Sequence, residues 1–443
     1  MTRARGSGLS LIVGVFAAIG LSAPAALANG DGAAEVPPPQ PVTLQRLIDQ
    51  VRLKNPSLQA KLRAYEAARG RVLAAWLPED PGFGVNVEGQ PDLFQFSRRT
   101  DNKYMVEQTI PFPTKLLLRA QIASREAQAA YQRYREEERY VIWHIEQPYY
   151  ELFMTRKTLE AMQEVRALLE KLSRTVQSRY ENNSASQQDL LKARIELSKI
   201  EVETFSLQQQ IHIAEAHLSH LLDQSLETRY ALVEEPPSPL QTLSRAELEH
   251  LAIGTRPELR AGEVGIKRAK AARLLADTTW LPDLTGRIEA RQFAGESGIR
   301  EYDTFLGITV PFWSLVKGAG GEWASASRDV QETEALYEAL KNEVLLAVHE
   351  AHAKVAAADH AATTYEQSIL PEARQQVEVA LASYEAGRLD FLSLIDAERM
   401  LREAQIAYYK VKADREQGLS DLRLAVGSEI DQTRWPATTG GAR

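Results

Sequence analysis

Residues 302–313 have the sequence Tyr302-Asp-Thr-Phe-Leu-Gly-Ile-Thr-Val-Pro-Phe-Trp313. Polar and apolar residues largely alternate in this stretch up to Val310, and Pro311 and Phe312 close it. A period of two residues predicts a β-strand with only one face in an apolar environment. A strand of about nine residues is also long enough to cross a bilayer when it is tilted.

Four segments of this kind occur in the chain, and we expect strands at about 83–90, 102–110, 284–293 and 302–310. Their polar positions include Glu88, Glu107, Arg287 and Arg291, as a watery lumen would require. Aromatic residues gather at one set of strand ends and suggest an interfacial girdle. They are Trp76, Phe112, Trp280, Phe312 and Trp313. A pair of soluble hairpins packed on helices is the alternative interpretation.

The sequence around the strands contains an internal repeat. Ile110-Pro-Phe112 returns as Val310-Pro-Phe312, and Trp76-Leu-Pro78 returns as Trp280-Leu-Pro282. Matches of the same order and spacing indicate two tandem repeats, which we place at 42–230 and 243–428, with a Pro-rich linker at 231–242.

Helices are expected on both sides of each strand pair. One helix of about 35 residues should precede the strands and end at the Trp-Leu-Pro motif. Residues 113–180 and 314–383 are rich in Ala, Leu, Glu, Gln and Arg and predict very long helices. Pro148 and Pro371 are expected to kink or break them. Each repeat should then turn near its tip and return as a second helix.

The N-terminus has the pattern of a secretory signal peptide. Arg3 and Arg5 precede the apolar run 9–21, and Ala26-Leu-Ala28 suggests a cleavage site. We therefore predict a signal peptide at 1–28, a flexible tail at 29–41 and a C-terminal tail at 429–443. The rest of the chain has no apolar stretch long enough for a transmembrane helix.

Composition excludes several classes of function. The 443 residues include no cysteine, which excludes disulfides, Cys-ligated metal sites and a lipid-modified cysteine. The formal net charge is −8 without a basic block, so nucleic acid is not an expected partner. Gly318-Ala-Gly-Gly321 lacks the rest of a phosphate-binding loop, and no catalytic motif is visible. We expect no enzyme activity, no cofactor and no resident metal, although His217/His220 and His349/His352 are spaced so that each pair could share a helix face.

If the strands lie in lipid, the chain must oligomerise. Unpaired strand edges in hydrocarbon cost several kcal/mol for each free backbone group. Four strands are too few to close a barrel, so several chains must share one. From the residues alone, a dimer, trimer or tetramer is possible.

The paired strands, the Pro-Phe motifs and the segment Tyr384-Glu-Ala-Gly-Arg-Leu-Asp-Phe-Leu-Ser-Leu-Ile-Asp-Ala397 resemble the TolC-type outer membrane efflux proteins. The resemblance implies a mostly α fold with a transmembrane β-barrel part. Three chains would share a twelve-stranded barrel and form a periplasmic α-helical tunnel. It also implies the outer membrane of a Gram-negative bacterium as the location. The expected function is a passive conduit in a tripartite efflux system, with a periplasmic adaptor and an inner membrane pump, of RND type, as partners.

The resemblance also implies which residues act at the closed periplasmic end. The family's acidic pattern matches Asp396, while Ser393 replaces the preceding acid, and the first repeat keeps Asp189. These three residues are the candidate gate. The candidate adaptor-contacting tips are Asn182, Asn183, Ser184, Gly387, Arg388, Leu389 and Asp390. The loops at 91–101 and 294–300 would be extracellular.

Two other functions stay open at this point. One is a periplasmic structural or adaptor protein built from helical hairpins, and the other is the outer membrane component of type I protein secretion. The cargo is equally open between drugs, metal ions and proteins.

Overall fold

The computed structural model describes residues 40–89, 101–182, 185–232, 244–313 and 321–428. All of them belong to the unit Pro39–Arg443. The predicted signal peptide, most of the linker and the C-terminal tail lie outside the described residues.

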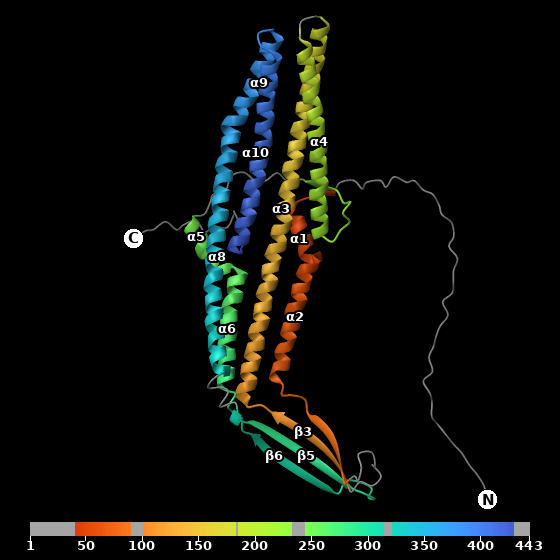
Figure 1. Ribbon diagram of the computed structural model, residues 1–443, viewed down its shortest axis with the longest axis vertical. Coiled ribbons are helices and arrows are strands. Elements are labelled where there is room, and N and C mark those ends of the chain that lie inside the picture. The colour runs from red at the N-terminus through yellow and green to blue at the C-terminus, as the bar shows by residue number, and fades with distance from the viewer. Residues whose placement is uncertain (1–39, 90–100, 183–184, 233–243, 314–320, 429–443) are drawn as a thin grey trace, which may run out of the picture. The chain divides into compact units, whose positions relative to one another are not determined.

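The first repeat runs from a short strand through two helices, two strands and two long helices (Figure 1). Its elements are β1 (Gln40–Val42), α1 (Leu44–Lys54), α2 (Pro56–Trp76), β2 (Gly82–Glu88), β3 (Asp101–Ile110), α3 (Pro113–Glu181), α4 (Gln187–Leu221) and β4 (Tyr230–Leu232).

The second repeat follows the same order of helix pair, strand pair and long hairpin. Its elements are α5 (Arg245–Thr255), α6 (Pro257–Asp277), β5 (Asp283–Phe293), β6 (Glu301–Thr309), α8 (Trp323–Thr364), the π-helix η3 (Tyr365–Ile369), α9 (Leu370–Glu385) and α10 (Phe391–Val426). The predicted fold class, mostly helical with one pair of long strands in each repeat, is confirmed.

The long helix predicted before the first strand is in fact two helices, and that prediction was wrong. Asn55 ends α1 and begins α2, because its side chain accepts a hydrogen bond from the backbone N–H of Leu58 at 3.1 Å. Pro56 then occupies the first turn, where its missing N–H costs nothing. The second repeat breaks in the same way at Arg256 and Pro257.

The two prolines of the long hairpins were predicted to kink or break the helices, and Pro148 does not break its helix. Pro148 is buried inside α3, which continues to Glu181. The core residues Ile145 and Leu152 flank it, so tertiary packing holds the helix across the missing hydrogen bond. Pro371 lies in the first turn of α9, directly after the π-helix η3, so the α-helical run is interrupted next to this proline as predicted.

A small parallel sheet was not predicted. Gln40 pairs with Tyr230, Pro41 with Ala231 and Val42 with Leu232. Residues 40–41 therefore belong to strand β1 rather than to the tail predicted at 29–41, and the first two residues of the linker predicted at 231–242 belong to β4. Strands of three residues have no periodicity that a sequence can display.

The main sheet joins the two repeats. Its order is β2-β3-β5-β6, all antiparallel, and β3 of the first repeat pairs with β5 of the second from Asp101↔Phe293 to Ile110↔Leu284. Within the described part of the chain, β2 and β6 each have one unpaired edge.

Helix α3 is the centre of the helical part. It contacts α2 and α6 towards the sheet and α4 and α10 towards the tips, and α8 contacts both α6 and α10 (Figure 1). Near the tips, one apolar core unites both hairpins, with side chains from α3, α4, α9 and α10. None of the described helices is long and apolar enough to cross a membrane.

Candidate functional site

One face of the sheet is polar, and it holds all four predicted lumen residues. Glu107 pairs with Arg287 across β3 and β5, while Glu88 and Arg291 lie in neighbouring rows of the same face. Cross-strand partners share a face, so the alternation in sequence placed these residues correctly relative to one another.

Ion pairs connect the strands on this polar face. Arg287 lies 3.7 Å from Glu107 and 3.2 Å from Glu289. Arg291 lies 3.2 Å from Asp101 and 3.5 Å from Glu301, on the strands to either side. Acidic side chains outnumber basic ones on this face. The acids are Glu88, Asp101, Glu107, Asp283, Glu289, Glu301 and Asp303, and the bases are Lys103, Arg287 and Arg291.

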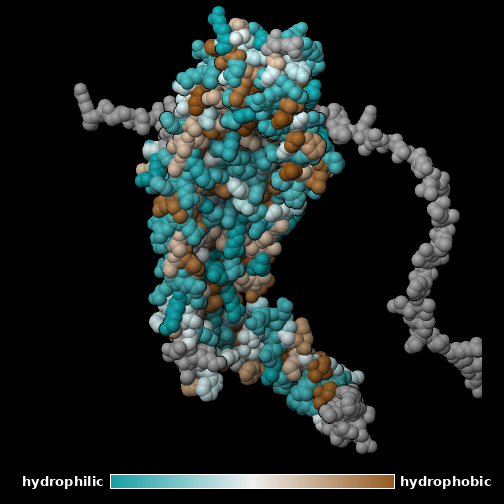
Figure 2. All heavy atoms as spheres, turned by 45° about the horizontal axis from the view of Figure 1, so that its top comes forward, coloured by the Kyte–Doolittle hydropathy of each residue, from teal (hydrophilic) through white to brown (hydrophobic). Residues whose placement is uncertain are grey.

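The opposite face is apolar and exposed in the single chain. Its rows include Phe83, Val85, Tyr104, Val106, Ile288, Tyr302, Leu306 and Ile308. Leu306 is 72% exposed, which is unfavourable in water for a side chain of this size. Figure 2 shows hydrophobic side chains on the sheet beside polar ones. An exposed apolar face on a sheet with a polar reverse is suited to lipid.

The predicted aromatic girdle lies at the junction of helices and sheet. Trp76 ends α2, Trp280 precedes β5, and Phe312 and Trp313 follow β6, all with exposed rings. Phe112 follows β3, so the five residues lie at the same end of the sheet. Lys115 fixes this junction, because its ammonium donates to the carbonyl of Leu281 at 2.7 Å and to Asp283 Oδ1 at 2.9 Å.

The two helical tips are closed by local hydrogen bonds. In the first, Ser186 and Asp189 form a capping box that begins α4. In the second, Gly387 takes the left-handed conformation with φ of 71°, and the Ser393 hydroxyl donates to Asp390 Oδ1 at 2.5 Å. That hydrogen bond lowers the pKa of Asp390. Asp189 and Ser393, two of the predicted gate residues, thus both take part in helix capping contacts.

Arg179 joins the two tips. Its guanidinium donates hydrogen bonds to the carbonyl oxygens of Tyr384 and Glu385, both at 3.1 Å. It also lies 4.7 Å from the centre of the Tyr384 ring. Sequence reasoning missed this arginine, because nothing in the sequence shows that α3 meets α9.

Asp396, the third predicted gate residue, is 54% exposed in its side chain, and its Oδ1 lies 3.6 Å from the guanidinium of Arg399 on the same helix. The structure does not pair it with Asp189, which bonds Ser186 instead. Among the tip residues, Asn182 donates to the carbonyl of Ser178 at 2.9 Å. Leu389 packs against the tip core, and Asn183 and Ser184 lie outside the described residues.

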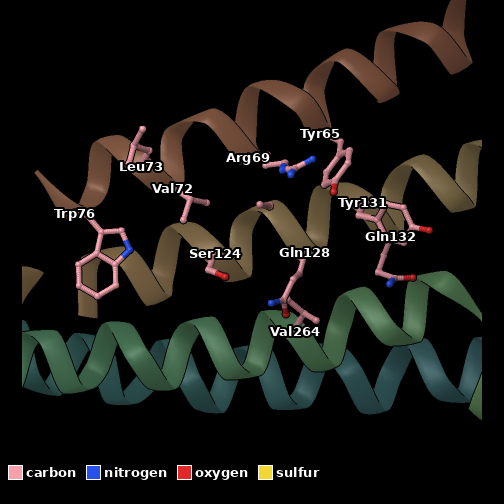
Figure 3. A pocket seen from close by; sticks show the side chains of 11 residues that line it. Tyr65, Arg69, Val72, Leu73, Trp76, Ser124, Gln128, Tyr131, Gln132 and Val264 are labelled. Carbon is pink, nitrogen blue, oxygen red and sulfur yellow. The ribbon is translucent and has the colours of Figure 1, made fainter. Parts of the chain in front are cut away.

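A groove between α2 and α3 was not predicted (Figure 3). Tyr65 and Trp76 lie towards its two ends, and the centre of the Tyr65 ring lies 5.3 Å from that of Tyr131 of α3, with the ring planes tilted by 58°. Its lining residues are Tyr65, Arg69, Val72, Leu73, Trp76, Ser124, Ala127, Gln128, Tyr131, Gln132 and Val264. Because Leu73 and Trp76 belong to a helix at the edge of the layer, this apolar surface is available to another chain.

No three His, Asp or Glu side chains in the described ranges are arranged to hold a metal ion. His349 lies 3.3 Å from Arg245, and His212 lies 3.6 Å from Glu215.

Known proteins share features with this chain. Residues 248–428 match the family model described as "Outer membrane efflux protein". Over these residues the chain is similar to that family. It is 26% identical over 247 residues to the cobalt-zinc-cadmium resistance protein CzcC of Cupriavidus metallidurans. That match covers 54% of this chain and 56% of CzcC, so it spans little more than half of the relative's length.

Solved structures share the fold of this chain. The outer membrane protein VceC of Vibrio cholerae has a TM-score of 0.75 at 20% identity, covering 88% of this chain and 97% of VceC. The outer membrane channel MtrE of Neisseria gonorrhoeae, solved in its open state, has a TM-score of 0.70 at 18% identity, covering 88% of this chain and 90% of MtrE.

Proposed function

We propose that this protein is the outer membrane channel of a tripartite efflux system. Three copies form a passive conduit whose barrel crosses the outer membrane and whose helices reach into the periplasm. The observation that carries this proposal is the two-faced, four-stranded sheet with a free edge on each repeat.

The free edges call for a ring of identical chains. The first repeat leaves β2, α2 and α4 at one side, and the second leaves β6, α8 and α9 at the other. One side of a copy therefore meets the opposite side of the next, which is the head-to-tail contact that generates closed rings. Closure also pairs the strand edges, whose free backbone groups would otherwise cost several kcal/mol each in hydrocarbon.

Apolar side chains on the free helices support the same arrangement. Along α4, Leu191, Ile195, Val202 and Phe205 are exposed at spacings of three, four or seven residues. That spacing is typical of a coiled-coil seam. Leu336 and Leu346 are exposed on α8, at the other side of the chain. A neighbouring copy would cover both surfaces.

In this ring the polar sheet face lines the barrel and the apolar face meets lipid. Loop 294–300 lies at the extracellular mouth, and the aromatic girdle lies at the periplasmic interface. Asp396, Asp189 and Ser393 form the gate at the far end, and the tips of both hairpins bind the periplasmic adaptor. The protein supplies no energy, so transport depends on an inner membrane pump of the RND type.

We infer that the cargo is a divalent metal cation. The relative CzcC is named for resistance to cobalt, zinc and cadmium, three metals that form divalent cations. The acidic excess of the polar sheet face favours cations over anions in a narrow passage. The metal is cargo in transit, so no resident site is required.

Crosslinking in the native cell, followed by extraction of the outer membrane and mass spectrometry, tests the proposal. We expect a trimer recovered with an adaptor and an inner membrane pump. A deletion strain should accumulate zinc, cobalt or cadmium and regain export when the gene is restored. A soluble periplasmic product without a pump would refute the conduit, and unchanged metal content with intact assembly would refute only the cargo.

A further inference from the structure

Glu398 is a buried carboxylate without a hydrogen-bond partner in the described part of the chain. It lies on α10, about two helical turns from the N-cap Asp390, and only 1% of the residue is exposed. Both carboxyl oxygens are enclosed and neither accepts a hydrogen bond from a described residue. Buried carboxylates are normally paired, so this one requires an explanation.

The charged groups next to Glu398 come from two helices. Arg399 and Arg402 belong to α10 itself, while Glu196 and Glu203 belong to α4. Core side chains that α3 places in the tip bundle are apolar. They are Val165, Leu169, Leu172 and Val176.

Glu196 is also buried, but it accepts hydrogen bonds from the nearby cationic side chains. Its Oε1 accepts hydrogen bonds from Lys199 at 2.9 Å and from Arg399 at 3.0 Å. Arg402 lies 3.9 Å from its other oxygen. Burial alone would raise the pKa of Glu196, but the Lys199 and Arg399 hydrogen bonds hold it below its usual value. Glu196 is therefore ionised while Glu398 has no bonded cation.

Burial raises the pKa of Glu398 to about 7, an increase that Arg402 opposes and Glu196 reinforces. The neutral acid fits this environment, whereas the ionised form is a buried charge without a bonded counterion. Opening the bundle would hydrate the carboxylate and return the pKa towards its ordinary value. Proton release therefore favours the loosened bundle.

We propose that Glu398 is a proton-binding site that couples the packing of the tip to pH. With the proton bound, α4 and α10 stay packed at the closed end. When the proton leaves, the uncompensated charge weakens that packing, so the tip opens more readily as the pH rises. Only the effect of this proton site on transport depends on the proposed channel function.

The proposal is tested by measuring amide hydrogen exchange of residues 391–405 in the full-length oligomer at about pH 5.5 and pH 8.5. The measured rates are corrected for the intrinsic exchange rate at each pH. In the wild type, we expect local opening to be about tenfold or more favoured at the higher pH. Glu398→Gln keeps the shape without the charge and should show no such rise. Glu398→Met is a second uncharged variant if the glutamine variant assembles poorly.

Glu403→Gln is the matched control, because it removes an exposed carboxylate of the same helix, five residues away, and should keep the pH response. The proton site is overturned if local opening increases with pH equally in Glu398→Gln, or if it does not increase in the wild type. Conductance in planar bilayers is measured on the same samples. If hydrogen exchange in the wild type depends on pH as expected but no conductance is seen at any pH, the channel function is rejected and the proton site is retained.

Discussion

The guanidinium of Arg179, at the end of α3, lies over the ring of Tyr384, at the end of α9, and bonds that residue's carbonyl oxygen. This contact ties the tip of the first repeat to the tip of the second. It adds to the apolar core beneath the tips and to the hydrogen bond from Arg399 to Glu196, which also join the two hairpins. The link lies where the proposed conduit is narrowest.

Replacing Arg179 by alanine should loosen the closed tip. The change removes two charge-assisted hydrogen bonds and a cation–π contact, together worth roughly 2–4 kcal/mol. Single-channel recordings should show a higher open fraction, and cells should become leakier to antibiotics. Arg174→Ala, an exposed arginine of the same helix, is the control. An unchanged open fraction would mean that Arg179 does not restrain the tip.

Asp396→Ala should reduce cation selectivity. Three such carboxylates at one constriction attract cations and repel anions. The reversal potential across a salt gradient in a planar bilayer measures this directly, and cation block should weaken as well. Glu403→Ala makes the same charge change further along α10 and should have little effect. If both variants keep wild-type selectivity and block, Asp396 is not a gate residue.

Phe205→Ala should destabilise the oligomer although Phe205 is 63% exposed in the single chain. A ring buried against the next copy loses roughly 3–5 kcal/mol on truncation to alanine, whereas a solvent-exposed one loses little. Resistance of the trimer band to heating in detergent reports the difference. An exposed polar residue of the same helix, Gln209→Ala, is the comparison. Equal melting of both variants would argue against α4 as an interface.

Arginine substitutions on the two sheet faces should have opposite outcomes. Leu306→Arg places a charge on the apolar face, which costs roughly 2–4 kcal/mol at the middle of a bilayer. We expect this variant to be lost from the outer membrane fraction. Asp303→Arg lies on the polar face and should insert normally while lowering cation selectivity. Normal insertion of Leu306→Arg would show that this face does not contact lipid.

The strands could be predicted closely because alternation is a local signal. The strand expected at 284–293 lies at Asp283–Phe293, and the face assignments of Glu107 and Arg287 agree with the register. Long-range features could not be predicted. The three-residue strands β1 and β4 pair across almost the whole first repeat, and neither shows a pattern alone.

Glu398 illustrates the same limit in the site. Its spacing of four residues from Arg402 is that of an ordinary surface pair, which predicts a solvated carboxylate. Only the packing of α3, α4 and α10 shows that it is buried. Likewise, the contact between Arg179 and Tyr384 depends on the meeting of two hairpins that lie about 200 residues apart in the chain.

Disulfide crosslinking between neighbouring copies tests the central claim most directly, because the chain contains no native cysteine to interfere. A cysteine at Val85 of β2 is combined with single cysteines at Tyr302, Thr304 or Leu306 of β6, and with Asp303 or Phe305 as controls. Residues paired across antiparallel strands share a face, so only the first three share the face of Val85. In intact outer membranes, we predict crosslinked species up to a covalent trimer from at least one of the first three and none from the controls. A chain that stays monomeric with all five partners, or one that crosslinks equally with both faces, would contradict the shared barrel.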